Sequence, residues 1–203
     1  MSVVSTSKQI RQAILTSEDR VFTTRDILNA SPEATRDLVD QVISRMVRSG
    51  ELQRVSRGLF SLPKIHSNLG PLPPAADDIA AAVERSIGVP VTPTGALALN
   101  ALRLSTQVPA KPEFLTAGPS RTIYVRNLPI RLKNASARRF RIQNPAVRLI
   151  IEALRTIGRD QVTDAIIDTI RSSISNGDRV DMGKHIGDAP VWMQPHLRQI
   201  AAT

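Results

Sequence analysis

Hydrophobic positions in the first third of the chain recur at helical spacing and then switch to the shorter spacing of strands. The spacing predicts a first helix over residues 5–16 and a short second helix over residues 25–29, with Thr24 as its N-cap. A third helix is predicted over residues 32–49, with Ser31 at its N-cap and proline at its first position. The pattern therefore predicts three helices within about fifty residues.

The third predicted helix is amphipathic and is followed by a hairpin. Its apolar side is expected to carry Leu38, Val42, Ile43, Met46 and Val47. Two strands are predicted over residues 52–56 and 59–62, joined through Arg57 and Gly58. Helices followed by a basic hairpin are typical of a winged helix-turn-helix, in which one helix enters the DNA major groove and the hairpin lies along the backbone.

The remainder of the chain is expected to form a second domain. Residues 63–76 contain four prolines and a glycine, and we interpret them as an extended linker. This places the boundary near residue 68 and predicts domains over residues 1–68 and 69–203. Further helices are predicted over residues 74–87, 94–104, 145–157, 161–174 and 191–202. Further strands are predicted over residues 114–116, 122–126, 130–133 and 140–142.

The expected fold class is therefore α+β. An N-terminal winged helix-turn-helix is followed by a mixed α+β domain that combines a small antiparallel sheet with several helices.

The third helix and the hairpin carry side chains that suit DNA. Glutamine and arginine make paired hydrogen bonds to adenine and guanine edges, and the N-terminal part of such a helix usually reads bases. We expect Thr35, Arg36 and Gln41 to contact bases, and Arg45 and Arg48 to contact phosphates. The full set of expected DNA contacts is Thr35, Arg36, Gln41, Ser44, Arg45, Arg48, Arg54 and Arg57. The alternatives are an ordinary solvated helix face and a winged helix that binds protein.

The net charge of +9 and the pI near 11.1 favour a polyanionic partner. Residues 1–70 hold ten Lys or Arg against seven Asp or Glu, whereas residues 111–148 hold nine against one. The alternation in RTIYVRNLPIRLK is expected to place Ile123, Val125, Ile130 and Leu132 on one face of two strands and Arg126, Arg131 and Lys133 on the other. The expected second basic surface comprises Arg121, Arg126, Arg131, Lys133, Arg138, Arg139 and Arg141. It would bind nucleic acid or an acidic partner, or it would only aid solubility.

Nothing in the sequence indicates an enzyme. The chain lacks cysteine, and its three histidines lack the spacing of metal ligands, so we expect no metal and no cofactor. No glycine-rich phosphate loop follows a predicted strand. No apolar run is long enough for a membrane span and the first residues lack the core of a signal peptide, so a cytoplasmic protein is expected.

Several segments of the chain resemble AbiEi-type antitoxins of the type IV toxin–antitoxin (abortive infection) systems. These segments are VSRGLFSLP after a helix ending in RMVRSGEL, then TGALALNALRLSTQVP, FLTAGPSRTI and NPAVRLIIEALRTIG. The resemblance covers about residues 5–160, rests on the order and spacing of the segments, and is strongest to the shorter members. The C-terminal segment GDRVDMGKHIGDAPVWMQPHL departs from the longer members.

The resemblance implies a repressor that binds inverted repeats in the promoter of its own operon. It further implies that the second domain counteracts a nucleotidyltransferase-like toxin without a stable complex. The expected partners are therefore double-stranded DNA and a cognate toxin. The alternatives are a protein-interaction module that neutralises its partner by direct binding, and a non-specific nucleic-acid-binding protein.

Overall fold

In a computed structural model, which describes residues 6–68 and 70–202, the chain has a mixed α+β fold with small sheets and several helices. This confirms the expected α+β class. The chain divides into two compact units. The first unit comprises Met1–Val89 and Ile123–Pro129, and the second comprises Pro90–Thr122 and Ile130–Thr203.

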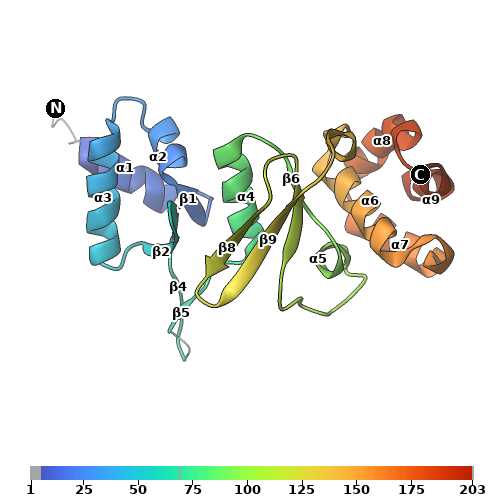
Figure 1. The fold of residues 1–203 in the computed structure, drawn as a ribbon, viewed down its shortest axis with the longest axis horizontal. Coiled ribbons are helices and arrows are strands. Elements are labelled where there is room, and N and C mark those ends of the chain that lie inside the picture. Colours follow the sequence, from blue (N-terminus) through green and yellow to red (C-terminus); the bar gives the residue numbers. More distant parts are fainter. Residues whose placement is uncertain (1–5, 69, 203) are drawn as a thin grey trace. The chain divides into compact units, whose positions relative to one another are not determined.

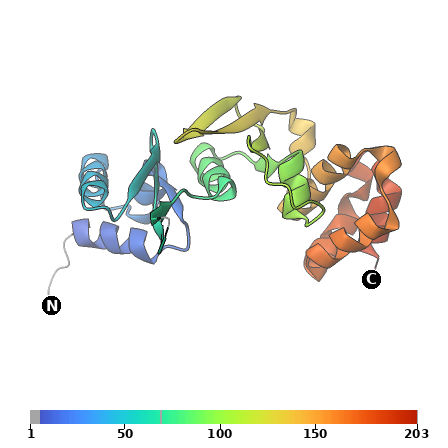
Figure 2. The ribbon, with the colours of Figure 1, turned by 90° about the horizontal axis from the view of Figure 1, so that it is seen from below.

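The first unit begins with three helices and a three-stranded sheet. The helices are α1 (Thr6–Thr16), α2 (Thr24–Ala30) and α3 (Arg36–Arg48), and each packs against the other two (Figures 1 and 2). The strands are β1 (Val21–Thr23), β2 (Gln53–Ser56) and β3 (Leu59–Ser61), in the order β1-β3-β2 with antiparallel pairing. Ser5, where the first helix was expected to begin, lies outside the described residues.

Threonines cap α2 and α3 at positions that differ from the expected ones. Thr23, rather than Thr24, caps α2 through a capping box with Asp26, which satisfies two backbone N–H groups at once. Helix α3 begins at Arg36 and not at Pro32, because the Thr35 hydroxyl accepts from the Leu38 N–H and Ser31 is used at the end of α2. The N-cap expected at Ser31 was therefore wrong.

An apolar cluster joins α1, α2 and α3 to the sheet of the first unit. It joins Ile10 and Ile14 of α1 to α3, whose buried residues are Val39, Val42, Ile43 and Met46. Leu38 and Val47, expected among the buried residues, are only partly buried at its edge, and Val39 is buried instead. The polar side of α3 is thereby fixed toward solvent.

The segment expected to be a linker is structured in part. Strands β4 (Lys64–His66) and β5 (Gly70–Leu72) pair as an antiparallel hairpin, and helix α4 (Ala76–Ile87) follows. Arg85 of α4 donates to the Val21 carbonyl at 2.8 Å and forms ion pairs with Asp19 and Asp26 at 3.0 and 3.4 Å. Helix α4 therefore belongs to the first unit, and the division falls at Val89 and Pro90, later than the boundary expected near residue 68.

The sheet of the second half contains the strands β6 (Val91–Pro93), β7 (Glu113–Thr116), β8 (Arg121–Val125) and β9 (Leu128–Asn134) in the order β6-β7-β9-β8. Strands β6 and β7 pair antiparallel, whereas β7 and β9 pair in parallel, so this sheet is mixed and not antiparallel throughout as expected. Ile123, Val125, Ile130 and Leu132 are all buried, which confirms the alternation expected for β8 and β9. Arg126 does not share the strand pattern, because it lies in the turn with φ of 54°.

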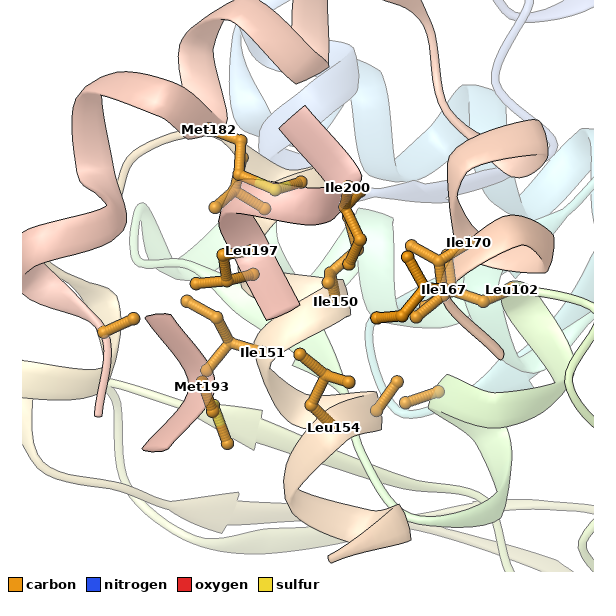
Figure 3. Packing of buried hydrophobic residues seen from close by; sticks show 14 of the residues in the cluster. Leu102, Ile150, Ile151, Leu154, Ile167, Ile170, Met182, Met193, Leu197 and Ile200 are labelled. Atoms are coloured by element: carbon orange, nitrogen blue, oxygen red, sulfur yellow. The ribbon is translucent and has the colours of Figure 1, made fainter. Parts of the chain in front are cut away.

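Helices form the core of the second unit. They are α5 (Ala96–Ala101), α6 (Pro145–Ile157), α7 (Asp164–Ser173), α8 (Asn176–His185) and α9 (Gln194–Ala201), with four short 3-10 helices at Ala137–Phe140, Arg159–Gln161, Ile186–Asp188 and Val191–Met193. Ile150, Leu154, Ile170, Leu197 and Ile200 lie together in this core (Figure 3). The strand expected over residues 140–142 is absent, because Phe140 ends a 3-10 helix and Arg141 follows in helical geometry.

Candidate nucleic-acid interface

The outward side of α3 carries the polar residues expected to contact DNA. Gln41, Ser44 and Arg48 are exposed, and they lie opposite the buried residues of the helix. Asp37 is exposed on the same side, and its carboxylate forms no hydrogen bond or ion pair with a described residue. A row of one carboxylate, one amide, one hydroxyl and one guanidinium offers both donors and acceptors to base edges and phosphates.

Thr35 and Arg36, at the start of α3, are engaged in local contacts. The Thr35 hydroxyl accepts from the Leu38 N–H at 3.3 Å, so this side chain has a structural task as the N-cap. Arg36 lies 3.7 Å from Asp40, one turn further along, in an exposed ion pair. Such exposed pairs contribute at most about 1 kcal/mol, so Arg36 can exchange this partner for a phosphate at little cost.

Arg45 and Arg48 fold back onto their own helix. Arg45 Nε donates to the Gln41 carbonyl and Arg48 Nε donates to the Ser44 carbonyl, each at 3.3 Å. These bonds leave the terminal nitrogens of both guanidinium groups for other acceptors. Arg45 lies to one side of the outward row, where it lines a pocket of about 240 Å³ with α1 residues. Arg48 is therefore the better placed of the two for a phosphate.

The hairpin between β2 and β3 presents its arginines differently. The Arg54 guanidinium lies over the ring of its cross-strand neighbour Phe60, 5.2 Å from the ring centroid, which holds the side chain against the sheet. Arg57 is exposed in the turn, next to Gly58. Gly58 has a φ of 73°, at which a residue with a side chain would be strained. At the tip of the hairpin, the Arg57 guanidinium is therefore exposed to solvent.

The second basic surface is less positive than its composition suggests. Lys133 Nζ donates to Glu113 Oε2 at 2.7 Å and Arg131 donates to Glu113 Oε1 at 3.4 Å, so one carboxylate pairs with two cations. The Lys133 hydrogen bond is the main cause that lowers the pKa of Glu113. Arg121, Arg126 and Arg141 are exposed, and none of their guanidinium groups forms a hydrogen bond or ion pair with a described residue.

Arg138 and Arg139 gather with an arginine that sequence reasoning did not single out. Both line a pocket of about 390 Å³ together with Ser136, Arg155, Asp188 and Pro190. Arg139 binds Glu152 through two nitrogens, and Arg155 Nε lies 3.5 Å from the same carboxylate. Glu152 is buried in α6 although it is charged. A sequence pattern places charged residues on the exposed side of a helix, so it gave no indication that Glu152 gathers these arginines.

Arg148 differs from the other cations of residues 111–148 because it is buried. Its guanidinium donates to the Thr92 hydroxyl and to the carbonyls of Ile142 and Gln143. This buried, hydrogen-bonded arginine ties α6 to β6 and does not contribute to a binding surface.

Comparison with protein families assigns the chain to a family. A family model described as a family of unknown function (DUF6088) matches residues 9–182. The chain belongs to the DUF6088 family. Among solved structures, this DUF6088 protein is similar to the crystal structure of the RV2827C protein from Mycobacterium tuberculosis, with 11% identity and a TM-score of 0.42. The likeness covers 98% of this chain and 77% of that one. A search of curated proteins gave no match.

Two further observations concern other kinds of site in the DUF6088 protein. Across residues 6–68 and 70–202, no three His, Asp or Glu side chains come together in a way that would hold a metal ion. In the same described ranges, each helix is too short or too polar to cross a membrane.

Proposed function

We propose that the protein binds double-stranded DNA in a sequence-dependent manner, and that the first unit is a winged helix-turn-helix. In this proposal α3 lies in the major groove, and the β2–β3 hairpin is the wing. The observation that carries it is the exposed row of Gln41, Ser44 and Arg48 on α3, opposite the side on which Val39, Val42, Ile43 and Met46 are buried. Such a helix can dock without exposing the core of the unit.

The contacts divide by chemistry. Gln41 is the base reader, since its amide can donate to and accept from an adenine edge. Arg48 and the wing residue Arg57 bind phosphates. The Asp37 carboxylate would repel phosphates, so in this proposal it faces the bases or lies away from the phosphate groups. Arg54 is held over the ring of Phe60, and it contacts the DNA backbone from the side of strand β2.

The biological role that we propose follows from the resemblance to AbiEi-type antitoxins. The protein represses its own operon by binding inverted repeats, with one copy on each half-site. Its second unit counteracts a nucleotidyltransferase-like toxin. A protein that binds only one half-site would cover too little DNA for strong selectivity.

The test compares Arg48→Ala with a matched control, Arg20→Ala. Arg20 is also exposed in the first unit, and it lies outside α3 and outside the turn between β2 and β3; its carbonyl accepts from the Leu62 N–H, at the end of β3 opposite that turn. Arg48→Ala should weaken binding to every duplex and reduce the slope of log K against log salt by about one, as loss of one phosphate contact requires. Arg20→Ala should leave the slope unchanged. Equal slopes for the two variants would contradict the proposed role of α3.

A further inference from the structure

The pocket beside α6 in the second unit contains more positive charge than its carboxylates neutralise. Arg138, Arg139 and Arg155 line it, while the carboxylates nearby are Glu152 and Asp188. Both oxygens of Glu152 are already engaged by Arg139 and Arg155. Asp188 lies 3.2 Å from Nδ1 of His185. Arg138 forms no hydrogen bond or ion pair with any described residue.

The buried Glu152 fixes the geometry of the pocket. It accepts from Nε and Nη2 of Arg139, so that guanidinium is held in a planar two-point pair. Thr94 Oγ1 donates to Glu152 from 3.5 Å, and Arg155 approaches Glu152 through Nε. These contacts leave Nη1 of Arg139 and both Nη atoms of Arg155 without a partner among the described residues. Several guanidinium donors are thus preorganised around one space.

The electrostatics of the cluster favour an added anion. Burial lowers the pKa of Arg155, the attraction of Glu152 opposes that effect, and repulsion from Arg139 and Arg138 lowers the pKa further. Like charges held close together in a partly buried site repel strongly. An anion between the guanidinium groups would relieve this repulsion.

The size of the pocket selects the kind of anion. A volume of about 390 Å³ falls within the range of about 300–1,000 Å³ typical of small-molecule sites. Arginine forks match phosphate geometry, and the Ser136 hydroxyl adds a neutral donor to the lining. We infer that the Arg138–Arg139–Arg155 pocket binds the phosphate group of a small phosphorylated molecule up to the size of a mononucleotide. This inference is independent of DNA binding by α3.

The test is calorimetric titration of the full chain with AMP, with adenosine and with inorganic phosphate. AMP and phosphate should bind, and adenosine, which lacks the phosphate, should not. Arg138→Ala is the first variant, because that side chain is exposed and has no structural partner, so the protein should fold normally. It should weaken AMP binding by about tenfold or more, which is the loss expected for hydrogen bonds to a charged group.

The controls separate the pocket from general charge. Arg141→Ala removes the same charge from an exposed neighbour that does not line the pocket, and it should leave AMP affinity within about twofold. Arg138→Lys keeps the charge but loses the fork, so it should bind AMP with intermediate affinity. Equal losses in Arg138→Ala and Arg141→Ala would overturn the inference, as would the absence of binding by both AMP and phosphate.

A third arm distinguishes the source of the phosphate. Short duplexes with a 5′-phosphate or a 5′-hydroxyl are titrated into the wild type and Arg138→Ala. If AMP fails to bind while the phosphorylated duplex depends on Arg138, the site takes a nucleic-acid terminus and the small-molecule inference is wrong. Since α3 is unchanged in these variants, DNA binding through the first unit is measured separately by Arg48→Ala.

Discussion

At the scale of single residues, the proposed interface depends on which side of α3 each side chain occupies. Sequence periodicity placed Gln41, Ser44 and Arg48 correctly on the exposed side, because the apolar residues of the helix determine its orientation. It could not reveal that Thr35 serves as the N-cap or that Arg45 lies beside α1. Those roles depend on where the helix begins and on what packs beside it.

Gln41→Ala tests base reading. The substitution should cost roughly 1–3 kcal/mol of binding free energy on the true site and little on a shuffled duplex, because a bidentate base contact discriminates by that amount. Fluorescence anisotropy with both duplexes measures the difference. A uniform loss on both sequences would mean that Gln41 does not read a base.

Thr35→Ala tests the cap. Loss of the hydroxyl that accepts from the Leu38 N–H should lower the free energy of unfolding by about 0.5–2 kcal/mol. Thr35→Ser retains the hydroxyl and should retain the stability, as followed by urea denaturation. If both variants are equally destabilised, the methyl group rather than the cap is responsible.

At the scale of elements, the sequence predicted α6 with the bounds that the structure shows, and it predicted the alternating faces of β8 and β9. Both have strong periodic patterns flanked by clear signals, such as Asn144 before Pro145. The β4–β5 hairpin and α8 were not predicted. The prolines around the hairpin indicated an extended linker, and α8 has no clear apolar side. The parallel pairing of β7 with β9 is a long-range feature that local patterns do not encode.

The Glu113 bridge between β7 and β9 predicts a pH dependence. Its pKa is lowered, chiefly by the Lys133 hydrogen bond, so its contribution to stability is present above the ordinary carboxyl value of 4.5 and is lost as the pH falls through the lowered pKa. Glu113→Gln should therefore lose less stability than the wild type between pH 6 and pH 3, as measured by thermal unfolding. Parallel pH profiles would contradict the bridge.

At the scale of the whole molecule, the first unit extends to Val89, beyond the boundary near residue 68 that the proline-rich segment suggested. Arg85 contacts Val21, Asp19 and Asp26, and the apolar side of α4 is buried. A fragment of residues 1–89 should therefore be more stable than one of residues 1–68, by about 2 kcal/mol or more, as expected for burial of one or two aliphatic side chains. Urea denaturation of the two fragments measures this, and equal stability would return the boundary to residue 68.

The two units also differ in the kind of positive charge that they carry. The cations of α3 and the hairpin are exposed and only weakly paired, which suits exchange with DNA phosphates. In the second unit, Arg131 and Lys133 share Glu113, and Arg139 and Arg155 share Glu152. Composition placed the larger charge excess in the second half, where ion pairs with Glu113 and Glu152 offset only part of it. The proposal for α3 therefore rests on the arrangement of its exposed polar side chains and not on net charge.

The central claim is tested most directly by binding of the full protein to the DNA upstream of its own gene and to a shuffled duplex, at two salt concentrations. The proposal predicts a preference of about a hundredfold or more for the upstream DNA, with a protected pair of inverted repeats. Equal and steeply salt-dependent affinity for the two duplexes would contradict sequence-dependent recognition by α3.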